Sequence, residues 1–225
     1  MSGPNIVFAA NTAQQVYDWL RDRILRGELL PGARLSETEV SKQIGVSRQP
    51  VREAFIRLAM NGLAEIRPQR GTYIRTISES TVPSARTIRE AVEADMVRLL
   101  AARITADDLT RLDEELDQQR RAAEAQDAEG FMALDDRFHR YLVAAAGHEH
   151  VWDVLEGLKS DMNRVRHLSA RTFTQQKLIE QHSQIVEALR EQDADRAEQA
   201  MRQHLKEILT DLPDVMRAHP GFFGV

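Results

Sequence analysis

The sequence predicts a mainly α-helical protein with two domains. These are a module of three helices and a β-hairpin over residues 1–78 and an all-α bundle of about six helices over residues 79–225. Three observations support this prediction. Apolar residues recur at helical spacing along most of the chain. Two short strand-like runs lie close together near residue 70. Finally, residues 1–78 hold eleven Lys and Arg against seven Asp and Glu, whereas the remainder has a net charge of −9.

The composition excludes several classes of protein. A chain of 225 residues forms one large domain or two ordinary ones. It contains no cysteine, which excludes a disulfide scaffold, a thiolate nucleophile and any Cys-ligated metal site. Charged residues interrupt the longest apolar stretches, and the first residues lack the features of a signal peptide. We therefore expect a soluble, cytoplasmic protein with no membrane partner.

The first two helices of the N-terminal domain have clear signals. A helix is predicted over residues 13–26, and Leu30-Pro31-Gly32 breaks the pattern after it. Ser36-Glu37-Thr38-Glu39 has the spacing of a capping box, so a short second helix should begin there. Gly45 is expected to end that helix just after Ile44. The apolar stripe of the first helix consists of Val16, Trp19, Leu20 and Ile24.

The third helix and the hairpin complete this domain. Ser47 is expected to cap the third helix, and Asn61-Gly62 should close it. Residues 63–67 and 72–76 then predict two strands joined by a basic tip. Three helices followed by a hairpin are the order of a winged helix-turn-helix. The residues predicted to be buried on the third helix are Val51, Ala54, Phe55, Leu58 and Ala59.

The outer face of the third helix suggests contact with duplex DNA. Arg48 and Arg52 are four residues apart, so they project from one face near the helix N-terminus, with Gln49 beside them. A helix in the major groove reads bases with its N-terminal residues, and arginine pairs with guanine through two hydrogen bonds. The hairpin tip at Arg70-Gly71 suits a DNA backbone or minor groove. Two alternatives remain: a solvated helix face, or a winged helix that binds another protein.

This domain resembles a known family. The stretches Leu30-Pro31-Gly32-Ala33-Arg34-Leu35-Ser36-Glu37 and Ile44-Gly45-Val46-Ser47-Arg48-Gln49-Pro50-Val51-Arg52-Glu53-Ala54, followed by Leu58 and Gly62-Leu63, resemble the DNA-binding domain of the GntR family over residues 12–76. The resemblance implies that bases or phosphates are contacted by Arg48 and Arg52. It also implies support from Arg34, Thr38 and Gln49, and a groove or backbone contact by Arg70 and Gly71 in the wing.

The second domain reads as helical throughout. Thr105, Gly147 and Thr172 have the residue types that cap or break helices at its predicted junctions. The expected helices are 82–102, 106–125, 128–146, 151–168, 173–191 and 194–212. A bundle is the expected packing.

Four residues of this domain could form a metal site. Asp135 and His139 are four residues apart and share a helix face. His182 and His204 each lie about eleven residues from a turn near residue 193, so both rings should sit roughly 16 Å from that turn on an antiparallel helix pair. Three imidazoles and a carboxylate suit Zn²⁺ first, and also Ni²⁺, Co²⁺ or Mn²⁺. The alternative is that these are ordinary core or surface residues.

The second domain also resembles a known one. Asp135-Asp136-Arg137-Phe138-His139, Glu180-Gln181-His182 and the residues from Met201 to His204 resemble the C-terminal effector domain of the FadR-type branch of GntR regulators, the FCD domain. The resemblance implies that Asp135, His139, His182 and His204 are metal ligands. It also implies that Arg89 faces an acidic effector, although Arg89 could instead form a surface ion pair with Glu93. Asn163 is a further candidate to line the effector cavity.

These features together predict a ligand-responsive transcription regulator. We expect a homodimer that binds a palindromic DNA operator and responds to a small carboxylic acid bound at the metal site. The alternative is a helical metalloenzyme with an appended DNA-binding module. The sequence lacks the Glu-x-x-His pairs of di-metal bundles, the His-Glu-x-x-His motif, a glycine-rich phosphate loop and a Gly-x-Ser-x-Gly elbow. We therefore do not expect an enzyme.

Overall fold

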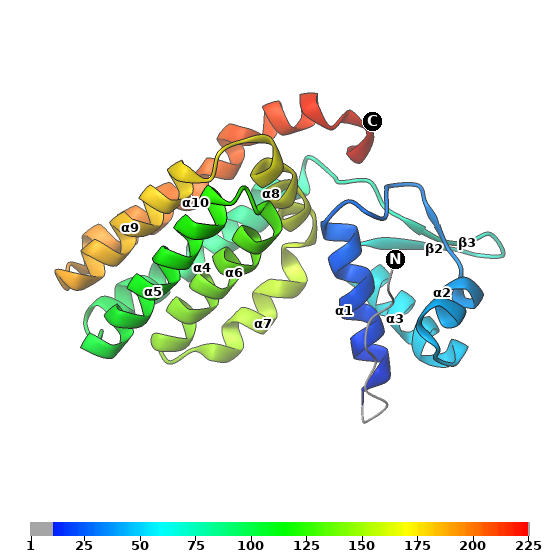
Figure 1. Cartoon of the computed structure of the whole chain (residues 1–225), viewed down its shortest axis with the longest axis horizontal. Helices are drawn as coiled ribbons and strands as arrows, with labels where there is room; N and C mark the ends of the chain where they lie inside the picture. Colours follow the sequence, from blue (N-terminus) through cyan, green and yellow to red (C-terminus); the bar gives the residue numbers. More distant parts are fainter. Residues whose placement is uncertain (1–10, 225) are drawn as a thin grey trace. The chain divides into compact units, whose positions relative to one another are not determined.

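The structure, a computed structural model, describes residues 11–224 and divides into two compact units (Figure 1). The N-terminal unit comprises residues 11–78 together with residues 219–224. The helical unit comprises residues 79–218. Our prediction placed everything from residue 79 onward in the second domain, whereas the last described residues belong to the first unit.

The N-terminal unit is a winged helix-turn-helix, as predicted. The antiparallel strands β2 and β3 form the hairpin, with Ile66 opposite Thr72. A third, two-residue strand pairs with β3 and gives the sheet order β1-β3-β2. This strand was not predicted, because two residues are too few to show an alternating pattern. The elements are α1 (Thr12–Leu25), β1 (Arg34–Leu35), α2 (Glu37–Ile44), α3 (Arg48–Met60), β2 (Ala64–Arg67) and β3 (Gly71–Ile74).

Helix ends in this unit follow the predicted signals with one exception. The Ser36 side chain accepts a hydrogen bond from the Glu39 amide at 3.3 Å. Gly45 ends α2 with a φ of 71°, a left-handed conformation that glycine adopts without strain. Ser47 occupies the position before α3, but its side chain makes no capping hydrogen bond there. Of the predicted core, Trp19 and Ala59 are only half-buried, while the buried residues are Val16, Leu20, Ile24, Val51, Ala54, Phe55 and Leu58.

The helical unit contains seven α-helices, one more than predicted. The helix expected over residues 151–168 is split at Lys159, which has non-helical φ and ψ values of −107° and 17°. The Lys159 side chain is buried and lies over the Trp152 ring, 3.6 Å from its centroid. Apolar residues continue at helical spacing on both sides of the break, so the pattern does not reveal it. The helices are α4 (Thr81–Ala101), α5 (Ala106–Glu124), α6 (Ala128–Ala145), α7 (Glu149–Leu158), α8 (Ser160–Thr172), α9 (Gln176–Arg190) and α10 (Ala194–Ala218).

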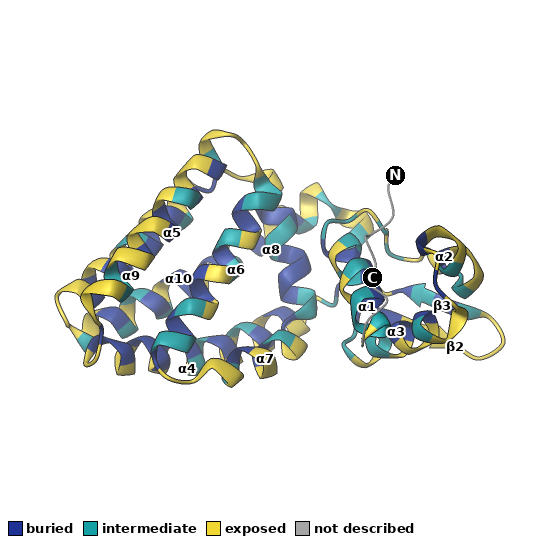
Figure 2. Ribbon diagram, turned by 60° about the horizontal axis from the view of Figure 1, so that its bottom comes forward, coloured by how far each residue is buried: buried dark blue, intermediate teal, exposed yellow. Residues whose placement is uncertain are grey.

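The core of the helical unit forms where α10 packs against α4, α8 and α9. Figure 2 shows buried residues along the faces of α4, α6, α8 and α10 that are turned toward the interior. One part of this interior is apolar and includes Val97, Leu100, Phe138 and Ile185. Another part buries charged and polar side chains, which form the site described below. Among residues 11–224, no helix has both the length and the apolar character needed to cross a membrane.

The chain passes between the two units twice. It leaves the N-terminal unit after Ser78 and returns after Ala218, at the end of α10. The returning segment pairs with Ile77: the Ile77 amide donates to the Phe222 carbonyl at 2.8 Å, and the Gly224 amide donates to the Ile77 carbonyl at 3.2 Å. The Ile77 side chain is fully buried. The helical unit is therefore joined to the first unit through both α4 and α10.

Two leucines test the packing of the N-terminal unit. Leu20 is 1% exposed in its core, so Leu20→Ala should lower the free energy of unfolding of this unit by about 2–5 kcal/mol. Leu30 is 54% exposed, and Leu30→Ala should change it by no more than about 0.5 kcal/mol. Urea unfolding of the full chain, followed by circular dichroism, measures both. Equal effects of the two substitutions would contradict this packing.

Candidate metal centre and DNA-contact surface

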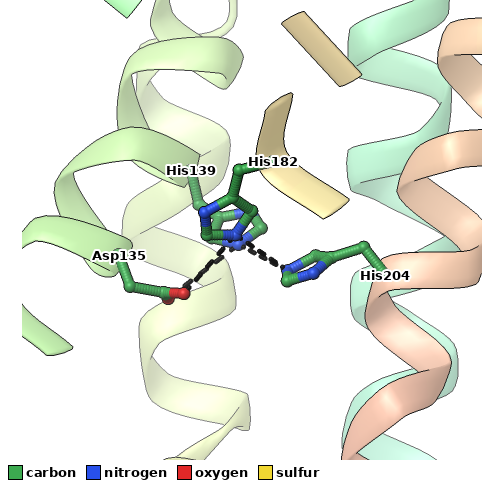
Figure 3. A group of neighbouring side chains, drawn as sticks. All are labelled: Asp135, His139, His182 and His204. Carbon is green, nitrogen blue, oxygen red and sulfur yellow. Dashed lines mark hydrogen bonds and ion pairs between the residues drawn. The ribbon is translucent and has the colours of Figure 1, made fainter. Parts of the chain in front are cut away.

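Three helices bring the four predicted ligands to one point. Asp135 and His139 project from α6, His182 from α9 and His204 from α10 (Figure 3). All four side chains are buried, and one ligand atom of each lies within 4.8 Å of the others. The two histidines on α9 and α10 lie level with each other across the turn between these helices, as their spacing predicted.

The distances between the ligand atoms suit a small cation. The Nε2 atom of His204 lies 3.1 Å from that of His139 and 3.3 Å from that of His182. The Asp135 carboxylate lies 3.6 Å from His182 Nε2 and 3.9 Å from His139 Nε2. Nitrogen and oxygen ligands arranged tetrahedrally around Zn²⁺ at 2.0–2.1 Å are about 3.3 Å apart. The four side chains therefore need only small adjustments to hold such an ion.

The other nitrogen of each ring faces an oxygen atom. A neutral imidazole carries its proton on one nitrogen only, so an acceptor beside Nδ1 leaves Nε2 with a free lone pair. The three oxygens are Glu93 Oε2, 2.7 Å from His139 Nδ1, Gln119 Oε1, 2.7 Å from His182 Nδ1, and Gln181 Oε1, 3.1 Å from His204 Nδ1. With the proton of each neutral ring on Nδ1, three Nε2 lone pairs would face one another, an arrangement that suits a bound cation.

The orientation of the Gln181 amide supports this proton assignment. Its Nε2 atom donates to the Glu207 carboxylate at 3.0 Å. Because an ionised carboxylate only accepts hydrogen bonds, the Gln181 nitrogen must face Glu207 and its oxygen must face His204. The proton of His204 is thereby held on Nδ1.

Burial and charge keep these groups in the forms that bind metals. Burial lowers the pKa of His182 to about 3 and the pKa of His204 well below its usual value. Both rings are thus neutral near pH 7, the form in which histidine coordinates a metal. Burial alone would raise the pKa of Asp135, but the neighbouring groups, of which Arg166 contributes most, together hold this pKa below its usual value.

A cavity adjoins two of the four ligands, Asp135 and His204. Arg89 is buried and donates to Glu93, with Nη2 3.0 Å from Oε2, so it is not the surface ion pair considered from the sequence. Arg166 donates to Asp135 and also to Asp136. The lining consists of Arg89, Met132, Asp135, Met162, Arg166, Ser169, Leu178, His204, Leu205, Glu207, Ile208 and Asp211. Asn163 is buried outside this set and accepts a hydrogen bond from Arg166 at 3.0 Å.

Several residues of the site escaped the sequence analysis. Glu93 was considered only as a surface partner of Arg89, although both lie on the buried face of α4. Arg166 lies on α8, beyond the unexpected break at Lys159. Gln119 and Gln181 are buried amides on helices that otherwise read as amphipathic, and nothing in the spacing marks them. The one signal available for these amides was that a polar residue occupied a helix position expected to be buried.

The predicted DNA-contact residues lie on the surface of the N-terminal unit. The side chains of Arg48 and Arg52 are 62% and 57% exposed on α3. Both donate to the Glu37 carboxylate on α2. Arg48 donates through Nη2 to Oε2 at 2.9 Å. Arg52 donates through Nε to Oε1 at 2.9 Å and through Nη2 to Oε2 at 3.3 Å. The hydrogen bond from Arg52 is the main reason that the pKa of Glu37 lies below its usual value. Glu37 therefore holds the two guanidinium groups side by side.

The remaining predicted contacts are divided between α2, α3 and the wing. Thr38 is exposed on α2, and Gln49 on α3 donates to Glu53 at 2.9 Å. The Arg34 side chain lies against Gly71 in the wing. If residue 71 carried a Cβ atom, that atom would lie 2.9 Å from Nε of Arg34. Gly71 also has a φ of 111°, so this position accepts only glycine without strain. Arg70, the residue before it, is exposed.

Comparison with known families gives two matches that cover most of the chain. Residues 12–74 match the family described as bacterial regulatory proteins, gntR family. Residues 85–207 match the FCD domain.

Individual relatives extend over nearly the whole chain. The HTH-type transcriptional repressor RspR of Escherichia coli K12 is 42% identical over 212 residues, which are 94% of this chain and 93% of that protein. A putative GntR transcriptional regulator of known structure from Rhodococcus sp. RHA1 is 29% identical, with a TM-score of 0.68 over 92% of this chain and 98% of that one. The solved structure of E. coli McbR/YncC shares the fold, with 23% identity and a TM-score of 0.79 over 90% of this chain and 97% of that one.

Proposed function

We propose that this chain, which belongs to the gntR family of bacterial regulatory proteins and carries an FCD domain, binds a palindromic operator as a homodimer under the control of a small carboxylic acid. The matched families and relatives show that the protein is a DNA-binding transcriptional regulator and not an enzyme. The families and relatives therefore do not support the alternative of a helical metalloenzyme.

The helical unit is proposed to bind one divalent metal ion. The observation that carries this proposal is the convergence of three imidazole Nε2 atoms and a carboxylate at one buried point. Nitrogen ligands of this kind suit Zn²⁺, and Ni²⁺, Co²⁺ or Mn²⁺ are also compatible. A bound ion would supply positive charge to the adjoining cavity and a coordination position for a carboxylate.

The effector site is proposed to lie in that cavity. Arg89 reaches it from α4, beside Asp135 and His204, so a carboxylate could contact the metal and a guanidinium together. Asn163 would act indirectly, because it contacts Arg166 and does not line the cavity.

The DNA contacts are proposed to come from α3 and the wing. Arg48 and Arg52 are exposed and held together by Glu37, and DNA would replace that carboxylate with base edges or phosphates. Arg34, Thr38 and Gln49 would support them, and Arg70 with Gly71 would contact a groove or the backbone.

A homodimer is proposed because one recognition helix covers only one half-site. The helical unit offers a surface for it. Helices α4 and α7 contact each other, and each carries two exposed apolar residues. These are Ile88 and Leu99 on α4 and Val154 and Leu158 on α7. Burying them against a second copy would remove apolar area from water.

Regulation is proposed to be a shift between two arrangements of the dimer. Arg89 lies two turns from the start of α4 at Thr81, and the predicted linker around residues 75–83 overlaps the first turn of this helix. An acid that favours one arrangement of the helices would change the spacing of the two recognition helices, and thus the DNA affinity.

DNA binding can be tested on an operator selected in vitro with the wild-type protein. Arg52→Ala should weaken binding about 10- to 100-fold, because a guanidinium paired with a base contributes about 1–3 kcal/mol. Arg196→Ala, which removes a half-exposed arginine of the helical unit, serves as the control. Fluorescence anisotropy at several salt concentrations measures both. The proposed contact is refuted if the two variants bind alike.

Metal binding can be tested by removing one ligand. After dialysis against Zn²⁺ and then buffer, the wild type should retain about one ion per chain and melt at a higher temperature than the metal-free protein. His182→Ala should lose both properties, whereas the exposed His148→Ala should keep them. Elemental analysis and thermal melting provide the measurements. Full retention of zinc by His182→Ala would rule out this site.

Glu93 is expected to raise metal affinity through His139. Glu93→Gln keeps the shape but removes the charge beside His139 Nδ1, so Zn²⁺ should bind about 10- to 100-fold more weakly. Glu90→Gln is the matched control, because Glu90 lies on the same helix and accepts from Arg202 at 3.2 Å. Competition with a coloured chelator measures the affinity. Equal affinities of the two variants would show that Glu93 has no such role.

A further inference from the structure

The cavity beside the metal ligands has two chemically different ends. Along α10, His204 and Asp211 both line it, and they are two turns or about 10.5 Å apart. Along α8, Arg166 contacts Asp135 near the metal ligands, and Ser169, one turn further, donates to Asp211 at 2.8 Å. Both helices therefore lead from the metal ligands to Asp211.

The end near the metal ligands suits one negative group. Each arginine there already has a carboxylate partner, Glu93 for Arg89 and Asp135 for Arg166. The positive charge without a partner would be that of the divalent ion, which attracts the carboxylate of a ligand.

The far end suits hydrogen-bond donors instead. Asp211 accepts a hydrogen bond from Ser169, and no cation of residues 11–224 lies within ion-pair distance of it. Glu207, which also lines the cavity, has Lys177 and Gln181 as donors. Burial raises the pKa of Asp211 and the neighbouring charge of Glu207 adds to this, while the hydrogen bond from Ser169 and the charge of Lys177 offset it only in part. A donor or a positive group placed there would compensate it, whereas a second carboxylate would be repelled.

Between the two ends the wall is mostly apolar. Its side chains are Met132, Met162, Leu178, Leu205 and Ile208. These contacts accept a carbon chain and do not distinguish one end of it from the other. The distinction between ligands must therefore come from the metal end and from Asp211.

We infer that the effector is a monocarboxylate whose far end carries hydroxyl groups or an ammonium group that reach Asp211, and that dicarboxylates of the same length are excluded. This inference rests on the proposed carboxylate site at the metal. It adds the chemistry of the second end of the ligand.

Four six-carbon acids test the inference by calorimetry on the Zn²⁺-loaded full chain. Hexanoate offers only a carboxylate, six-carbon aldonates such as gluconate add hydroxyl groups, 6-aminohexanoate adds an ammonium group, and adipate adds a second carboxylate. We expect an aldonate or 6-aminohexanoate to bind about 10- to 100-fold more tightly than hexanoate, as one hydrogen bond to a charged group allows. Adipate should bind no more tightly than hexanoate. If the aldonate binds more tightly, the far end of the ligand carries hydroxyl groups. If 6-aminohexanoate binds more tightly, it carries an ammonium group.

Asp211→Asn tests whether this residue causes the ranking. The variant should lose the preference for donor ligands and should bind adipate more tightly than the wild type does. Asp214→Asn, the same substitution at an exposed position one turn along α10, should keep the wild-type ranking.

The outcomes separate this inference from the proposed function. If none of the four acids binds the Zn²⁺-loaded protein, the carboxylate site itself is wrong, and the inference fails with it. If hexanoate or adipate binds as tightly as the donor ligands, or if Asp211→Asn leaves the ranking unchanged, the inference alone is overturned.

Discussion

The helical unit depends on one constraint: three imidazole Nε2 atoms and a carboxylate converge in a buried site. The arrangement persists because each ring is held from behind by an oxygen atom on a neighbouring helix. The backbone of α6, α9 and α10 is thus positioned by hydrogen bonds whose combined effect is to create a space for positive charge.

The same polar groups connect this space to the adjoining cavity. Glu93 contacts both His139 and Arg89, and Gln181 joins His204 to Glu207. A ligand that displaces Arg89 or Glu207 therefore alters the surroundings of a metal ligand. Arg89 belongs to α4 and Glu207 to α10, the two helices through which the chain enters and leaves the helical unit. The cavity is therefore lined by residues of both of these helices.

The sequence predicted those parts of the protein that depend on local periodicity. The order of the winged helix, the exposed Arg48 and Arg52, and the matched depth of His182 and His204 all follow from helical spacing. The break at Lys159 was missed because the apolar spacing continues across it, and the contact of Lys159 with the Trp152 ring is visible only in the structure. Gln119, Gln181 and Arg166 were missed for the same reason. Each matters only through a partner far away in sequence, which no spacing rule reveals.

The pairing of Ile77 with residues 222–224 makes the helical unit an insertion within the N-terminal unit. The N-terminal unit is accordingly assembled from two separate stretches of polypeptide, and the second stretch is synthesised after the helical unit. A fragment ending at Ser78 would lack the hydrogen-bond partners of Ile77 and would expose a side chain that the intact protein buries completely. The hydrogen bonds between Ile77 and residues 222–224 therefore form only after the whole helical unit has been made.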